Sequence, residues 1–170
     1  MDTVESAKSD ALRLIARRPR TRKEIHTRLK ERNHSEKTIQ ITLNDLSDLG
    51  YLDDLSFSRE WCHQRMESRP LGARGLRREL ILKGVSSSLA EEAINEVFAA
   101  ENEHLVIKRL VIKRVEKGHK ITGPKEIRRM KDFLARRGFS MDTINHVLSS
   151  LEGKLGDTLP TEEWDNTSQI

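Results

Sequence analysis

One pattern of residues typical of a helix end followed by a helix start occurs three times along this chain, and it constrains the fold more than any other feature. In each copy an apolar residue is followed four positions later by Asn or Gly, and two positions after that by Ser. The copies are Leu29-Asn33-Ser35, Leu80-Gly84-Ser86 and Leu134-Gly138-Ser140. Asn and Gly take the left-handed conformation that ends helices, and Ser caps helix N-termini. Each copy therefore predicts the end of one helix and the start of the next.

The spacing of the copies indicates how many helices each unit contains. The first leucines are 51 and then 54 residues apart. Further apolar residues lie four positions before and fourteen positions after each leucine, at Ile25, Leu76 and Met130 and at Leu43, Ile94 and Leu148. Common helical arrays repeat at roughly 34 to 47 residues, so the longer period favours three helices per unit. The predicted units are residues 5–52, 53–101 and 102–151.

Other signals place the remaining helices and define the fold class. A first helix ends before Pro19, and a second begins after Thr21, a plausible N-cap. The first helix of the second unit starts at Asp53 or Asp54, and that of the third spans about 102–117. Strand patterns are nearly absent. We expect an all-α protein with three tandem three-helix repeats in an elongated, curved array, followed by a disordered acidic tail over 152–170.

Composition narrows the class of protein and its compartment. The only cysteine is Cys62, so the sequence allows no internal disulfide and no cysteine zinc cage, as expected for a reducing compartment. No apolar run approaches the roughly 20 residues that span a bilayer, and the N-terminus lacks a signal core. We expect a cytoplasmic monomer that does not engage a membrane.

Basic residues are concentrated in the second helix of each unit. Segments 17–32, 65–83 and 121–137 contain eight, six and six basic residues against two acidic residues each. The following segments 35–54 and 84–103 are acidic, with five carboxylates each against one and no basic residues. A regular stacking of the units would align the basic helices into one stripe. Such a stripe could follow a polyanion such as nucleic acid.

The candidate contact residues follow from this pattern. On the second helices they are Arg22, Arg28, Arg74, Arg77, Arg78, Lys83, Arg128, Arg129 and Arg136. A Val-Ile-Lys-Arg doublet within 106–115 adds Lys108, Arg109, Lys113 and Arg114, with its apolar members in the core. For any single residue, a solvated helix face is the better interpretation, whereas for the stripe as a whole we favour a binding function. The whole could also be a passive helical scaffold. We expect the second and third units to contribute most of the binding.

Signatures of catalysis are missing from the sequence. There is no glycine-rich phosphate loop, and the six histidines form no metal-ligand cluster. Cys62 beside His63 is a poor dyad because sequence neighbours on a helix point about 100 degrees apart. We interpret Cys62 as a packed thiol, and Asp53 and Asp54 as helix N-caps. No enzyme activity, cofactor or metal is expected.

Two segments of the second unit resemble a known family. They are GYLDDLSF at 50–57 and RPLGARGLRRELILKGV at 69–85. Together with the triplication over about 10–151, they are similar to the RecX family. The chain departs from the family pattern at Ala73, where proline is frequent, and at Gly75, where arginine is frequent. Gly75 would weaken its helix by roughly 0.5–1 kcal/mol.

The resemblance implies a regulator of RecA, the recombinase that polymerises on single-stranded DNA. Members of the family lie in the groove of that filament and typically inhibit its ATP hydrolysis, strand exchange and stimulation of repressor self-cleavage. The expected partners are thus the RecA filament and single- or double-stranded DNA. A direct DNA-binding regulator built from helix-turn-helix-like units is the alternative.

Overall fold

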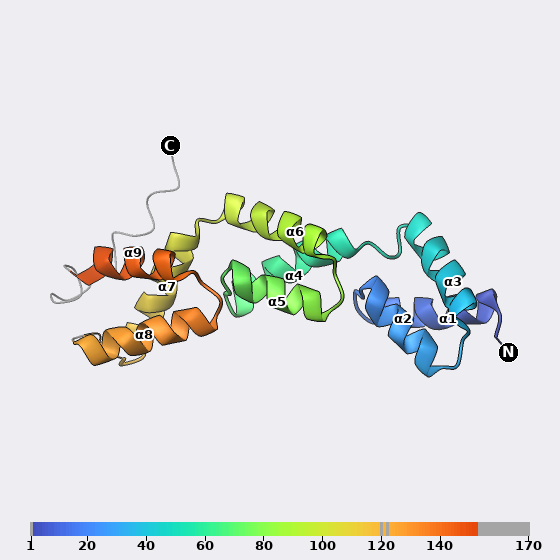
Figure 1. Ribbon diagram of the computed structural model, residues 1–170, viewed down its shortest axis with the longest axis horizontal. Helices are drawn as coiled ribbons and strands as arrows, with labels where there is room; N and C mark the ends of the chain where they lie inside the picture. Colours follow the sequence, from blue (N-terminus) through green and yellow to red (C-terminus); the bar gives the residue numbers. More distant parts are fainter. Residues whose placement is uncertain (1, 120, 122, 153–170) are drawn as a thin grey trace. The chain divides into compact units, whose positions relative to one another are not determined.

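The computed structural model describes residues 2–119, 121 and 123–152, and over these residues the chain contains nine α-helices and no strands. The helices form two compact units, of which the first ends at Glu101 and the second begins at Asn102. The predicted all-α class with three-helix groups is confirmed (Figure 1). The predicted tail lies outside the described residues, apart from Glu152 at the end of the last helix. None of the described helices is both long and apolar enough to cross a bilayer.

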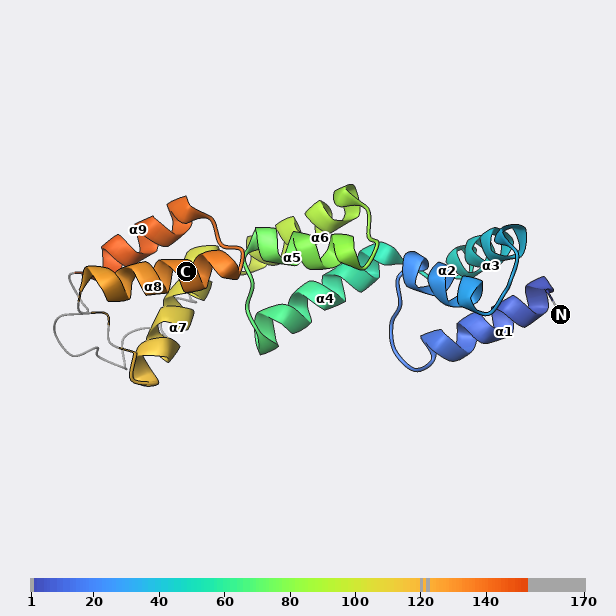
Figure 2. The ribbon, with the colours of Figure 1, turned by 60° about the horizontal axis from the view of Figure 1, so that its bottom comes forward.

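The first unit contains two successive three-helix groups. The helices are α1 (Val4–Ile15), α2 (Arg22–Glu31), α3 (Glu36–Asp48), α4 (Asp54–Ser68), α5 (Ala73–Leu82) and α6 (Ser87–Ala100). In both groups the third helix packs against the other two, as the two views show (Figures 1 and 2). The second unit contains α7 (Glu103–Glu116), α8 (Pro124–Arg136) and α9 (Met141–Glu152), and α9 again contacts both partners. We call the groups α1–α3, α4–α6 and α7–α9 repeats 1, 2 and 3.

The residues that end the second helix and start the third adopt the same geometry in all three repeats. Asn33, Gly84 and Gly138 have φ values of 63°, 89° and 88°, in the left-handed region that the sequence pattern predicted. The next residue donates its N–H to the carbonyl of the repeated leucine, five positions back. The following serine hydroxyl accepts a backbone N–H of the next helix, from Thr38, Leu89 or Thr143. The same hydrogen-bonded corner therefore joins the second and third helices of every repeat.

Each repeat has an apolar core around its repeated leucine. Leu29, Leu80 and Leu134 are fully buried. In repeat 1, Leu29 belongs to a cluster that includes Ala11 on α1 and Ile39 on α3. All members of this cluster are aliphatic, and α1 contributes two small residues to it, Ala7 and Ala11. The buried members of α7 include Val106 and Val111, as predicted for the apolar face of the Val-Ile-Lys-Arg doublet.

Candidate binding surface

Arg22 is the first predicted contact residue, and its side chain binds within the protein. Its Nη1 atom donates to the carbonyl of Leu43 at 3.1 Å and to Ser47 Oγ at 2.9 Å, and Nη2 donates to Asn44 Oδ1. These acceptors all lie on α3. The guanidinium therefore fixes the start of α2 to the last turns of α3, a role that its charge alone did not indicate.

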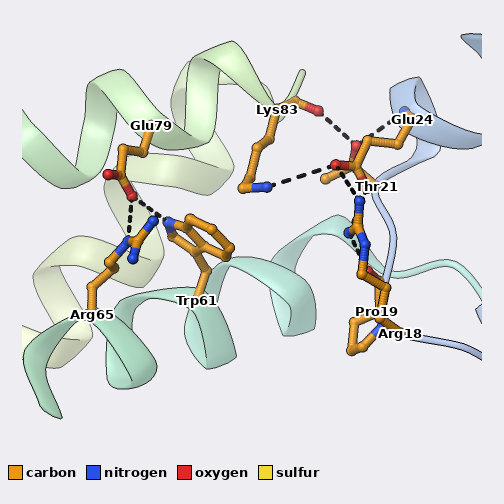
Figure 3. Close-up of polar contacts among 8 residues, drawn as sticks. All are labelled: Arg18, Pro19, Thr21, Glu24, Trp61, Arg65, Glu79 and Lys83. Atoms are coloured by element: carbon orange, nitrogen blue, oxygen red, sulfur yellow. Dashed lines mark hydrogen bonds and ion pairs between the residues drawn. The ribbon is translucent and has the colours of Figure 1, made fainter. Parts of the chain in front are cut away.

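Lys83 also makes contacts inside the first unit, at the junction of repeats 1 and 2 (Figure 3). Its ammonium lies 4.0 Å from the centroid of the Trp61 ring and 3.6 Å from Glu24 Oε1 on α2. Its carbonyl accepts a 2.6 Å hydrogen bond from the buried hydroxyl of Thr21. A cation over an indole face is attracted by the ring quadrupole. Lys83 thus couples α5 to both α4 and α2.

Trp61 is contacted by two cations and one carboxylate. The guanidinium carbon of Arg65 lies 4.4 Å from the ring centroid, in addition to the ammonium of Lys83. The indole Nε1 donates to Glu79 Oε2 at 2.9 Å, and Arg65 Nε donates to the same oxygen at 2.6 Å (Figure 3). The half-buried indole is held between α4 and α5 and adjoins the junction, where it could report on changes around Lys83.

Asp54 adds a second hydrogen bond across the junction, besides the one from Thr21 to the carbonyl of Lys83. The backbone N–H of Arg22 donates to Asp54 Oδ1 at 2.8 Å, which ties the first turn of α2 to the first turn of α4. Asp53 caps α4 as predicted, accepting from the backbone N–H groups of Leu55 and Ser56. The interpretation of Asp54 as an ordinary N-cap is wrong, because its carboxylate caps α2 of the preceding repeat instead.

Repeat 2 presents three of the candidate arginines on α5. Arg74, Arg77 and Arg78 are all exposed. Arg77 forms an ion pair with Glu91 on α6. Arg74 and Arg78 are one helical turn apart, on the same face of α5, and have no acidic partner among the residues that the structure describes. These two guanidinium groups remain available to an external anion.

The remaining candidate of repeat 1 is Arg28 on α2. Arg28 is exposed, and its Nη1 atom lies 2.7 Å from Glu31 Oε2, three residues further along the same helix. Both side chains are about half exposed, so solvent screens this pair, which contributes a few tenths of a kcal/mol at most. A stronger anion could therefore displace Glu31 from Arg28 at little cost.

The candidates on α7 differ in exposure. Arg109 and Lys113 are exposed, whereas Lys108 and Arg114 are half-buried. The guanidinium carbon of Arg114 lies 4.3 Å from the centroid of the Phe133 ring on α8. Arg114 therefore links α7 to α8 within repeat 3 through this cation–ring contact.

The candidates on α8 are Arg128, Arg129 and Arg136, and all three are exposed. Arg129 and Arg114 line one surface hollow, together with His119 and Glu126. Each unit thus has exposed arginines on the second helix of its repeats. The single basic stripe through all three repeats stays a prediction.

Sequence reasoning missed a group of cations in the loop before α2 and in the first turn of α2. Arg18, Arg20 and Lys23 line a hollow at the junction, beside Arg28 and Lys83. The strongly basic segment 17–32 was a signal for this group. Charge counts did not separate these three residues from the others, because the hollow exists only where repeat 2 meets repeat 1.

The described residues provide neither an activated thiol nor a cluster of metal ligands. Cys62 is fully buried, and burial, together with Glu79, raises the pKa of its thiol to about 11. The interpretation of Cys62 as a packed thiol is confirmed, since a thiol of that pKa is not ionised near neutral pH. Within the described ranges, no three His, Cys, Asp or Glu side chains come together as metal ligands.

Family models agree with the three-helix organisation. The models of the first, second and third three-helix domains of RecX match residues 7–46, 53–94 and 106–148, in that order. The matches contain most of the residues of repeats 1, 2 and 3.

Relatives and solved structures agree with the family models. "Regulatory protein RecX" of Streptomyces coelicolor is 32% identical over 92% of this chain and 84% of its own length. The protein of the same name from Prosthecochloris aestuarii is 34% identical over 87% of this chain and 95% of its own length. The crystal structure of RecX from Lactobacillus salivarius has the same fold, with a TM-score of 0.79 at 22% identity over 87% of this chain and 96% of that one. On its three domain matches and these identities, the chain belongs to the RecX family.

Proposed function

We propose that this chain is a non-catalytic modulator of the RecA recombinase. It binds the RecA filament on DNA and lowers ATP hydrolysis, strand exchange and the stimulated self-cleavage of repressor. Family membership and the regulatory names of its relatives support this role.

The observation that carries the proposal is the pair of exposed arginines on α5. Arg74 and Arg78 lie on one helix face, and neither is neutralised by an acidic side chain of the described chain. Guanidinium groups bind carboxylates and phosphates through two parallel hydrogen bonds, so they suit acidic protein surfaces and DNA alike. Arg77 contributes less, because Glu91 already pairs with it. We therefore assign Arg74 and Arg78 to the contact with the filament.

The direct test is the ATPase activity of RecA on single-stranded DNA with increasing amounts of this protein. We expect wild-type protein to inhibit hydrolysis, and Arg74→Glu/Arg78→Glu to require at least about tenfold more protein, because two charge-assisted contacts are lost. The matched control is Arg13→Glu/Lys37→Glu, which reverses two exposed cations on α1 and α3. Equal inhibition by both double variants would place the contact elsewhere, and no effect of wild-type protein would refute the proposal.

The alternative is a direct DNA-binding regulator. Three short helices per repeat also describe helix-turn-helix units, and the exposed arginines of α5 and α8 would then contact duplex DNA. Titration of labelled duplexes of different sequence separates the two roles. Salt-dependent, sequence-selective binding without any change in RecA ATPase would favour the DNA-binding regulator.

A further inference from the structure

A surface hollow lies within the first unit where repeat 2 meets repeat 1, with a volume of about 230 Å³. Its basic lining residues are Arg18, Arg20, Lys23, Arg28 and Lys83, and the exposed side chain of Leu82 adjoins them. Arg18, Glu24 and Lys83 approach one another here from the loop before α2, from α2 and from the end of α5 (Figure 3). One water occupies roughly 30 Å³ of liquid, so the hollow can hold a polyatomic group. It is complete only when both repeats are docked.

The hollow has more positive than negative charge. Its two carboxylates are Glu24 and Glu31, against five cations. Glu24 accepts from both terminal nitrogens of Arg18, at 3.0 and 3.2 Å, and also pairs with Lys83. Glu31 pairs with Arg28. Both carboxylates are therefore already engaged, and an excess of cationic groups remains.

Arg20 carries the clearest sign of a missing partner. Its Nε atom is buried and has no hydrogen-bond acceptor among the described residues. Burial, and after it the nearby charge of Arg18, lowers the pKa of Arg20, and Arg28 and Arg17 act in the same direction. A buried donor without an acceptor is unfavourable, as are several like charges in one place. An anion in the hollow would relieve the repulsion between these cations.

We propose that this junction hollow is a binding site for a phosphate group, held by Arg20 and Lys23 and, after displacement of Glu31, by Arg28. Planar guanidinium forks match the oxygen atoms of phosphate, and several such groups converge here from one short segment. Leu82 is 75% exposed beside them and offers an apolar contact to a sugar or base attached to the phosphate. This site is separate from the contact that we assign to Arg74 and Arg78 on α5. Binding of phosphate to it does not require RecA.

Trp61 provides an intrinsic probe of the hollow. Its ring is 4.0 Å from the ammonium of Lys83, which also lines the hollow, so an anion held in the hollow changes the electric field at the indole. The sequence contains two tryptophans, and Trp164→Phe leaves Trp61 as the single emitter. In this background the fluorescence is titrated separately with inorganic phosphate, a short oligothymidylate and a polyglutamate peptide, in buffer without phosphate.

We expect a saturable fluorescence change with phosphate or with the oligothymidylate. In Arg20→Gln/Arg28→Gln the affinity should fall at least about tenfold, since charge-assisted hydrogen bonds are removed. The control Arg13→Gln/Arg69→Gln removes two exposed arginines that do not line the hollow, and should bind as wild type. The single variant Arg28→Gln changes an exposed side chain and should itself weaken binding, so a folding defect at Arg20 cannot account for the result.

The probes also identify the source of the phosphate group. Binding of inorganic phosphate as tight as that of the oligothymidylate assigns a free phosphate, whereas tighter oligothymidylate binding that weakens in Leu82→Ser assigns a nucleic acid backbone. Equal or tighter binding of polyglutamate would overturn the proposal, because the hollow would then be a site for acidic peptide. No titration with either phosphate probe, or equal binding by both double variants, would also overturn it. RecA is absent from these measurements, so their failure leaves the proposed function untouched.

Discussion

The pKa values of two carboxylates, Asp53 and Asp54, are shifted in opposite directions although the two residues are adjacent in the sequence. Asp53 accepts backbone N–H groups at the start of α4, and the bond from Ser56 lowers its pKa most. Asp54 accepts a single N–H, from Arg22, and burial is the main reason that its pKa is raised. Ionisation of Asp53 therefore favours the folded state, whereas ionisation of Asp54 opposes it.

We expect the free energy of unfolding of Asp54→Asn, measured as a difference from wild type, to become more favourable to the variant as the pH rises. In wild type the folded state holds the Asp54 proton to higher pH than the unfolded state, so this group contributes stability below its unfolded pKa and loses it as pH rises through the folded pKa. Asn keeps an oxygen that can accept the Arg22 N–H and has no charge to bury. Urea unfolding between about pH 3 and pH 7 measures the difference.

The matched control is Asp53→Asn, for which the sign reverses. The pKa of Asp53 is lowered, so its contribution is present above the unfolded pKa and is lost as pH falls through the folded pKa. Asn is also a good N-cap, so the cap itself survives. The Asp53→Asn variant should lose stability relative to wild type as pH rises, and parallel pH profiles for the two variants would contradict the assignment.

At the scale of the helices, the corner between the second and third helix of each repeat has the same residue pattern, and repeat 1 departs from it at one position. The residue after the left-handed position is Val85 in repeat 2 and Phe139 in repeat 3, and both are buried apolar side chains. In repeat 1 it is His34, which is 9% exposed. The imidazole is accommodated by carboxylates, with Asp10 Oδ2 at 3.3 Å from Nε2 and Asp2 Oδ1 at 3.4 Å from Nδ1.

His34→Val should leave the free energy of unfolding unchanged or raise it by up to about 1 kcal/mol, because it removes a buried imidazole whose Nδ1 atom has no hydrogen bond, while Asp10 keeps its ion pair with Arg32. The change makes repeat 1 like repeat 2 at this corner. Asp10→Ala should instead cost about 1–3 kcal/mol, since it leaves His34 and Arg32 without their shared carboxylate. Chemical denaturation measures both variants.

A double variant sharpens the comparison. When His34→Val is already present, Asp10→Ala should cost less, because only Arg32 then loses a partner, and Arg32 is half exposed. Equal costs of Asp10→Ala in the two backgrounds would show that the histidine and the carboxylate are not coupled.

At the scale of the whole chain, local and tertiary features differ in how far the sequence could predict them. Helix ends depend on residues within a few positions, so Thr21, Ser35 and Gly84 identified their corners without knowledge of the packing. The roles of Arg22 and Lys83 depend on helices that lie far away in sequence. Their charge indicated an external partner, whereas α3 and Trp61 supply internal ones.

The two compact units also differ in how their repeats are coupled. Repeats 1 and 2 share a unit, and Thr21, Lys83 and Asp54 link them through hydrogen bonds between backbone and side chain. Gly84 lies so close to Lys23 that an added Cβ would meet its side chain at 2.2 Å. The junction is therefore packed as well as hydrogen-bonded. Repeat 3 forms the other unit by itself.

Equivalent core substitutions should therefore have effects of different extent. Leu80→Ala and Leu134→Ala each remove a fully buried side chain at the same corner, at a cost of about 2–5 kcal/mol to the unit concerned. By hydrogen exchange, Leu80→Ala should raise amide exchange in α4–α6 and also in α2, because Lys83 at the end of α5 binds Thr21 and Glu24. Leu134→Ala should raise exchange in α7–α9 and leave α1–α6 unchanged. Faster exchange of α4–α6 in Leu134→Ala would mean that the two units unfold together, and unchanged exchange of α2 in Leu80→Ala would mean that the junction does not couple repeats 1 and 2.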